Sequence, residues 1–146
     1  LTFTSEPLAE ELEVTGPVQA ILYGMSSAPD TDWVVRLTDV HPDGYSRPLC
    51  DGILRARYRE SFEQERLLEP GQIYRFEVDL WATSNVFLEG HRIRVVITSS
   101  SFPRFDRNLN TGGPIHKEAA GQIAINTVLH DVLRPSHLVL PVIPPR

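Results

Sequence analysis

The chain has 146 residues, enough for one domain with a substantial core but short for two. Hydrophobic residues make up 41% and charged residues 23%, a globular composition that excludes a disordered or fibrous chain. Nineteen acidic against fourteen basic residues give a net charge of −5, which argues against nucleic-acid and membrane partners. The single cysteine, Cys50, excludes an intrachain disulfide and favours the cytoplasm. We expect one domain over residues 1–146.

Apolar and polar residues alternate with a period of two along most of the chain, which predicts half-buried β-strands. The clearest case is Ile73 to Ala82, in which the apolar side chains, Ala82 included, share one face. The predicted strands are residues 1–4, 18–23, 33–40, 53–58, 73–82, 92–98, 122–128 and 138–142. One short helix is predicted within Arg59 to Leu68, before the Pro70-Gly71 turn. This pattern predicts an all-β fold, an antiparallel β-sandwich of the jelly-roll type.

One segment interrupts this rhythm of short strands and turns. Ser99 to Ala120 shows neither strand nor helix periodicity and contains Pro103, Gly112, Gly113 and Pro114. A connection of that length in a small domain is usually functional or disordered. Because it also carries phenylalanines, which a solvated linker tends to lack, we expect an ordered loop that covers or docks on something.

A serine nucleophile is the first chemistry to test. Gly24-Met25-Ser26-Ser27-Ala28 matches half of the G-x-S-x-G elbow, which lies between a strand and a helix. The residues after Ser26 instead begin the turn-forming run Pro29-Asp30-Thr31-Asp32. The sequence therefore predicts a loop serine and no catalytic residue in the chain.

Metal ligands are the second possibility. Asp39, His41 and Asp43 alternate, so an extended chain would direct them to one side. Pro42-Asp43-Gly44 is nevertheless an ordinary turn, in which the aspartate supports its own backbone. None of the five histidines forms a two-histidine motif with ligand spacing. We therefore expect a solvated rim rather than a metal site for the acidic group Asp30, Asp32, Asp39, His41 and Asp43, and no cofactor.

Two functional classes fit the remaining surface features. A group of aromatic residues could form a sugar-stacking platform, as in a carbohydrate-binding module: Trp33, Tyr45, Tyr58 and Trp81. The alternative is an accessory domain that completes an enzyme, which an uncovered apolar patch beside the long loop would favour. Arg55, Arg57 and Arg59 alternate into a basic stripe, typical of a solvated sheet face or of a partner surface for carboxylates.

A set of motifs follows in a fixed order along nearly the whole chain. Its segments are 1–8, 13–18, 30–33, 37–44, Asp51-Gly52-Ile53-Leu54-Arg55-Ala56-Arg57-Tyr58-Arg59, 90–95, Ser101-Phe102-Pro103-Arg104-Phe105-Asp106-Arg107-Asn108, 110–112 and 135–141. Together they resemble one family, the X-Pro dipeptidyl-peptidase-like hydrolases of the CocE/NonD group, which includes cocaine esterase and α-amino-acid ester hydrolases. Members are serine hydrolases with an α/β-hydrolase domain, a helical cap and a C-terminal jelly roll that is galactose-binding-like.

The resemblance implies that this chain, which starts at Leu1 without an initiator Met, is the C-terminal jelly roll of a longer hydrolase. No residue of the Ser-His-Asp triad can be carried over, so we expect the isolated domain to be inactive. Its partners would be the α/β-hydrolase and cap domains of the same parent, and an uncovered docking face also favours self-association. The expected docking loop comprises Phe102 and Phe105 as apolar anchors, Arg104, Asp106 and Arg107 as polar contacts, and Asn108 and Asn110. The alternative is that the loop only covers the open end of this sandwich, with Asp106 and Asn108 holding its own turns.

Overall fold

The structure, a computed structural model, describes residues 1–114 and 116–144, and its regular elements are almost all strands. They are β1 (Thr2–Thr4), β2 (Leu12–Ser26), β3 (Asp32–Val40), β4 (Ser46–Arg55), β5 (Tyr74–Phe87), β6 (Arg92–Thr98), β7 (Asn126–Leu129), β8 (His137–Val139) and β9 (Val142–Ile143). In this part of the chain the only helical segment is one 3₁₀ turn, η1 (Ala56–Tyr58). No helix among the described residues is long and apolar enough to cross a membrane.

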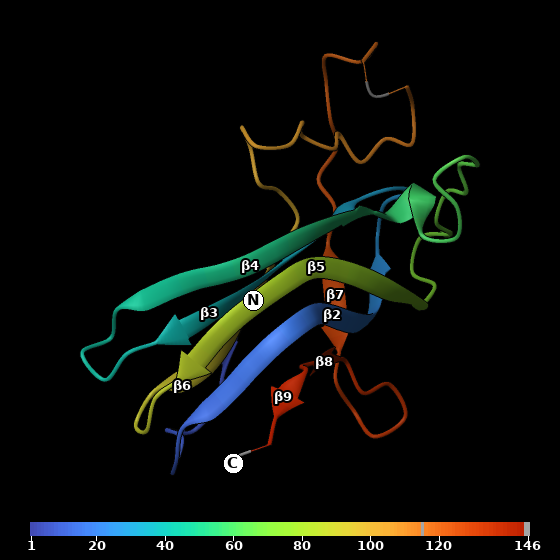
Figure 1. The fold of residues 1–146 in the computed structure, drawn as a ribbon. Coiled ribbons are helices and arrows are strands. Elements are labelled where there is room, and N and C mark those ends of the chain that lie inside the picture. The colour runs from blue at the N-terminus through green and yellow to red at the C-terminus, as the bar shows by residue number, and fades with distance from the viewer. Residues whose placement is uncertain (115, 145–146) are drawn as a thin grey trace.

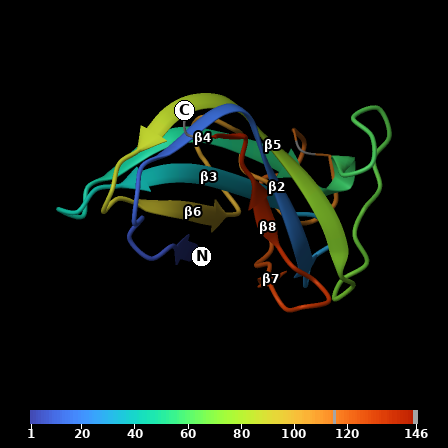
Figure 2. The same ribbon diagram turned by 60° about the horizontal axis from the view of Figure 1, so that its bottom comes forward.

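The strands form two antiparallel sheets, which confirms the predicted β-sandwich (Figures 1 and 2). One sheet has four strands in the order β1-β6-β3-β4. In the other, β2 pairs with β5 along one edge. Along its opposite edge β2 pairs successively with β9, β8 and β7. The finer assignment to a galactose-binding-like jelly roll stays a prediction.

The core lies between the sheets and is built by the apolar phase of the alternating strands. Trp33, Val35 and Leu37 project inward from β3, opposite Phe76 and other apolar residues of β5. The rings of Trp33 and Phe76 lie 5.3 Å apart between centroids. Each such side chain contributes about 1.5–3 kcal/mol through burial, so the sandwich has a core of its own.

Several details of the predicted elements are wrong. Residues 59–68 form no helix, and the helical turn lies earlier, at 56–58, where β4 ends. The predicted alternation of β5 ends at Trp81, whose φ of 66° is left-handed. On the paired strand β2, the register shifts between Pro17 and Gln19 at the same place. This irregularity reverses the phase of the strand, so Ala82 is exposed rather than inward.

The long loop follows β6 and projects beyond one end of the sandwich, near η1 (Figure 1, yellow-orange to orange). The described residues between β6 and β7 form no helix or strand, as predicted for 99–120; Ile115 lies outside the described residues. The turns after β3 and β5 lie at the opposite end, because β6 runs from the second of these turns toward the long loop. The two ends of the sandwich therefore carry different sets of polar residues.

Gly52 provides a test of how closely the sheets approach. A Cβ added to Gly52 in β4 would overlap the carbonyl oxygen of Asp79 in β5. We therefore expect Gly52→Ala to lower the free energy of unfolding by about 1–3 kcal/mol or more, measured by urea denaturation. Cys50→Ala, on the same strand, is the matched control and should cost less; equal losses would contradict the close approach.

Candidate functional site

Two buried aspartates lie just before and at the start of β3, and each is paired with an arginine. Asp30 accepts hydrogen bonds from the side chain of Arg57 (Nε to Oδ2, 2.7 Å) and from its backbone N–H (3.0 Å). Asp32 accepts a bidentate pair from Arg55, at 2.8 and 3.0 Å. Because Asp30, Asp32 and Arg57 are all at most 2% exposed, each charge depends on its partner.

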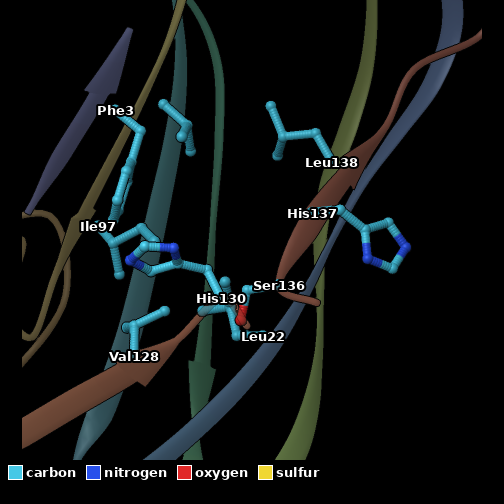
Figure 3. A pocket seen from close by; sticks show the side chains of 9 residues that line it. Phe3, Leu22, Ile97, Val128, His130, Ser136, His137 and Leu138 are labelled. Atoms are coloured by element: carbon cyan, nitrogen blue, oxygen red, sulfur yellow. The ribbon is translucent and has the colours of Figure 1, made fainter. Parts of the chain in front are cut away.

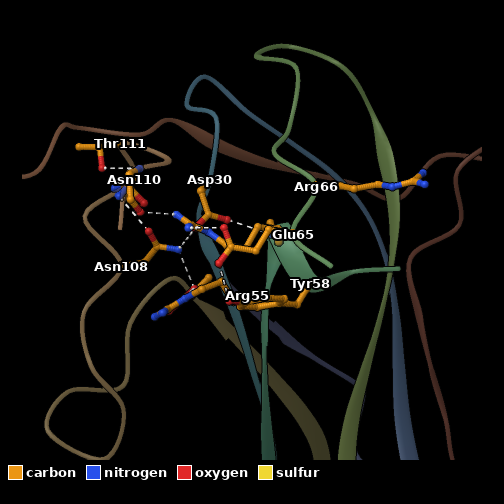
Figure 4. Close-up of polar contacts among 12 residues, drawn as sticks. Asp30, Arg55, Tyr58, Glu65, Arg66, Asn108, Asn110 and Thr111 are labelled. Atoms are coloured by element: carbon orange, nitrogen blue, oxygen red, sulfur yellow. Dashed lines mark hydrogen bonds and ion pairs between the residues drawn. The ribbon is translucent and has the colours of Figure 1, made fainter. Parts of the chain in front are cut away.

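Asn108 of the long loop completes this cluster (Figure 4). Its Nδ2 donates to Asp30 Oδ2 and to Asp32 Oδ1, both at 2.8 Å, so one amide bridges the two carboxylates. The arginines contact the loop too, because Arg57 Nη2 donates to the Gly113 carbonyl and Arg55 Nη2 to the Asp106 carbonyl. We call Asp30, Asp32, Arg55, Arg57 and Asn108 the anchor cluster. It fixes the loop to the sandwich through charged and buried groups.

The local sequence explains how these arginines come together. Arg55 ends β4, and Arg57 lies in the single turn of η1. Both side chains therefore turn toward the residues that lead into β3, rather than into solvent. The two arginines thus form neither a solvated sheet face nor a partner surface, the two interpretations that the sequence offered, because the carboxylates that they bind belong to the same chain.

The outer part of the loop leaves aromatic surface uncovered. Phe102 is 58% exposed, and the guanidinium of Arg107 lies 4.6 Å from the centre of its ring. Phe105 is half-buried, with the guanidinium of Arg104 5.2 Å from its ring centre. Arg104 also pairs with Asp51 of β4. The predicted docking residues thus divide into those that hold the loop and those that it presents.

Asn110 belongs to the residues that hold the loop. Its φ of 62° is left-handed, a conformation that asparagine tolerates better than most residues. Its backbone N–H donates to Asn108 Oδ1 at 2.9 Å, and its side chain donates to the Gln122 carbonyl at 3.0 Å. Gln122 Nε2 donates in return to the Asn110 carbonyl at 2.6 Å. These bonds join the two halves of the loop.

The surroundings of Asp51 and Cys50 shift the pKa values of both side chains. Partial burial opposes ionisation of Asp51, but hydrogen bonds and charges from Arg104 and Arg36 lower its pKa below the ordinary value of 3.8. Burial and then the neighbouring Asp51 charge raise the pKa of the Cys50 thiol to about 11. The thiol is therefore protonated at neutral pH and is a poor nucleophile.

Sequence reasoning missed two apolar residues beside the loop. Ile123 is 92% exposed and Ile125 is 71% exposed, just before β7. The prediction assigned both to a strand over 122–128, but β7 begins only at Asn126. Ser27 holds this segment against the sandwich, because its backbone N–H donates to the Ile125 carbonyl and its Oγ accepts from the Ile125 N–H. We call Phe102, Phe105, Ile123 and Ile125 the apolar loop face.

Ser26 is the last residue of β2 and pairs with Asn126 of β7, so the prediction of a loop serine is wrong, whereas Asp43 lies in the predicted turn. Ser26 is 1% exposed, and its Oγ accepts the backbone N–H of Ala28 at 3.1 Å. Asp43 accepts the backbone N–H of Tyr45 at 2.9 Å, which is the expected aspartate turn. Neither residue is placed for catalysis.

A pocket of about 200 Å³ opens between the sheets (Figure 3). Apolar side chains such as Phe3, Leu22 and Ile97 line most of it. Ser136 at its rim donates to the Leu129 carbonyl and accepts the Tyr23 N–H, so its hydroxyl is fully engaged. His130 and His137 also line the pocket, but most of its lining is apolar, and it is smaller than typical ligand sites of about 300–1,000 Å³.

The aromatic residues do not assemble into a sugar platform. Trp33 is 2% exposed in the core. Tyr45 and Tyr58 lie at opposite ends of β4, which is about 30 Å long for its ten residues. Trp81 is 71% exposed but lies alone among these four on β5. The aromatic arrangement therefore does not support the carbohydrate-binding alternative.

Comparison with known families assigns the fold. The X-Pro dipeptidyl-peptidase C-terminal non-catalytic domain family matches residues 1–139. The chain belongs to this family. As a member of the X-Pro dipeptidyl-peptidase C-terminal domain family, it is a non-catalytic domain of the type found in CocE/NonD hydrolases, which confirms the resemblance in the sequence.

Relatives of this family member are much longer proteins. Cocaine esterase of Rhodococcus sp. (strain MB1 Bresler) is 50% identical over 145 residues, which cover 98% of this chain and 25% of the esterase. The structure of an aminopeptidase from a marine sediment Thaumarchaeota archaeon superposes with a TM-score of 0.95 at 35% identity, covering 99% of this chain and 26% of that one. An α-amino acid ester hydrolase superposes with a TM-score of 0.94 at 38% identity, covering 97% and 25%. The chain spans about a quarter of the length of these relatives.

The anchor cluster gives a first prediction for the site. Asn108→Ala should lower the free energy of unfolding by about 1–3 kcal/mol, because two buried carboxylates lose a shared donor. It should also speed proteolytic cleavage within residues 99–125, measured by limited proteolysis. Asp106→Ala is the control, because it changes an exposed side chain of the same loop and keeps the backbone carbonyl that Arg55 contacts. Cleavage at the wild-type rate in Asn108→Ala would contradict the anchoring.

The Asp51–Arg104 pair gives a pH dependence. Because the pKa of Asp51 is lower in the folded protein than its ordinary value of 3.8, the pair stabilises the fold above that pH. The contribution is lost as the pH falls through the lowered pKa. The difference in unfolding free energy between wild type and Asp51→Asn should stay constant from neutral pH to about pH 5 and shrink below pH 3.8. A difference that grows on acidification would contradict this assignment.

Proposed function

We propose that the domain packs on the α/β-hydrolase and cap domains of a CocE/NonD-like serine hydrolase and helps to enclose the substrate region. The apolar loop face carries this proposal. Phe102, Ile123 and Ile125 are 58%, 92% and 71% exposed on a loop that the anchor cluster holds in place. An ordered segment that presents apolar side chains to water indicates a surface that a partner covers.

The relatives support a partner within the same polypeptide. Cocaine esterase contains a segment 50% identical to this chain and about three quarters of further sequence. A domain joined in that way meets its neighbour at high effective concentration, so a modest interface is enough. The parent's chemistry would be acyl transfer from an ester or amide to water through an acyl-enzyme.

In this proposal, different residues of the loop have different roles. Asn108 and Asn110 fix its backbone, while Phe102 and Phe105 act as anchors in the neighbouring domain. Arg104 and Arg107, each beside one of these rings, make polar contacts at the rim with Asp106. A rigid apolar centre with a charged rim is the usual arrangement of a protein interface.

A chimera tests this function. Residues 1–146 would replace the corresponding quarter of cocaine esterase, and we expect a folded, active esterase, whereas the 146-residue chain alone turns over no model ester. Replacing Ile123 and Ile125 by Ser should lower the esterase activity of the chimera at least tenfold or lower its melting temperature by several degrees. The isolated chain should be unaffected, because both side chains are already exposed.

Leu88→Ser is the matched control. Leu88 is 51% exposed in the turn at the opposite end of the sandwich, so the chimera should tolerate its change. Equal effects of the isoleucine changes in the chimera and in the isolated chain would refute docking through this loop.

A further inference from the structure

Asp39 differs from the other buried aspartates of the sandwich. It is 2% exposed near the end of β3, as deeply buried as Asp30 and Asp32. Those two are neutralised by arginines. Among the described residues, the groups within 4 Å of Asp39 that can carry positive charge are the imidazoles of His41 and His91.

The three side chains converge from the end of β3, from the turn after β3 and from the turn after β5. Asp39 Oδ1 lies 2.8 Å from His91 Nδ1, and Asp39 Oδ2 lies 4.0 Å from His41 Nε2. The two imidazole rings lie 4.4 Å apart between centroids and are tilted by 33°. One ligand atom from each residue falls within 4.8 Å of the others. This group lies at the end of the sandwich opposite the apolar loop face.

Both turns hold the imidazoles in place. The backbone N–H of His41 donates to the Tyr45 carbonyl at 2.8 Å, and the Tyr45 ring packs edge-on against the imidazole. The backbone N–H of His91 donates to the Leu88 carbonyl at 3.0 Å. His91 is 8% exposed, whereas the His41 side chain is 34% exposed. The group is therefore largely formed in advance and open to solvent on the His41 side.

We propose that Asp39, His41 and His91 bind a divalent transition-metal ion of the zinc class. Two imidazoles and one carboxylate are ligands that such ions prefer, and three protein ligands leave a fourth position for water. The ion supplies the positive charge that arginine supplies to Asp30 and Asp32. Ligand atoms on one tetrahedral ion lie about 3.4 Å apart. The ion would therefore replace the short Asp39–His91 contact at a slightly longer distance, while the partly exposed His41 rotates toward the other two residues.

This site departs from the sequence-based expectation of no metal. The predicted solvated rim is also wrong, because Asp30, Asp32 and Asp39 are buried. Asp43 is engaged in its turn. His91 lies 52 positions from Asp39, and only the antiparallel pairing of β3 with β6 brings the two together. The bound ion would fasten the turn after β3 to the turn after β5.

Zinc and cobalt titrations of the tag-free 146-residue protein test the site. We expect one equivalent of Zn²⁺ in calorimetry, a rise of several degrees in melting temperature, and Co²⁺ absorption bands of a four- or five-coordinate ion. His41→Gln and Asp39→Asn should weaken binding at least tenfold. His137→Gln, at an exposed histidine outside the group, should bind like wild type.

Each result decides the proposal. The absence of saturable binding at millimolar Zn²⁺ overturns it, as does an affinity that His41→Gln leaves unchanged. A loss in His137→Gln equal to that in His41→Gln also overturns it, because the ion would then be bound by surface histidines in general. If Asp39→Asn fails to fold, the half-exposed His41 variant decides the matter on its own.

Discussion

The buried charges of the anchor cluster constrain the rest of this structure. Arg57, at 2% exposure, cannot be left without Asp30, and removing one partner of such a pair typically costs about 3–5 kcal/mol. These charges lie where β4 ends and β3 begins, at one end of the sandwich. Asn108 joins them directly, so the position of the long loop is coupled to the sheet rather than left to weak surface contacts.

That coupling explains how a segment without strand or helix presents apolar side chains in a defined place. The loop satisfies its backbone through Asn108, Asn110 and Gln122, while its phenylalanines remain outside. Fixing a surface before binding reduces the conformational entropy that association must overcome. An accessory domain that presents a rigid apolar loop to a neighbouring domain is consistent with this arrangement.

Much of the fold could be predicted because strand alternation is local, but pairings between distant residues could not. The basic stripe of Arg55 and Arg57 was visible, whereas its partners depended on how β3 and β4 pair. The prediction of which β5 side chains face inward failed after Trp81, because this single left-handed residue reverses the alternation. The contact between His91 and Asp39 could not be predicted for the same reason, since only the pairing of strands in the sheet brings these residues together.

Footprinting of side chains with hydroxyl radicals tests whether the long loop docks on the hydrolase domain. Phe102 and Ile123 would be compared in the isolated chain and in the chain fused to the hydrolase portion of cocaine esterase. Tyr45, which is 59% exposed at the opposite end, serves as the internal reference. If the loop docks, Phe102 and Ile123 are strongly protected in the fusion, and the labelling of Tyr45 is unchanged. Equal labelling of Phe102 and Ile123 in both proteins would contradict docking.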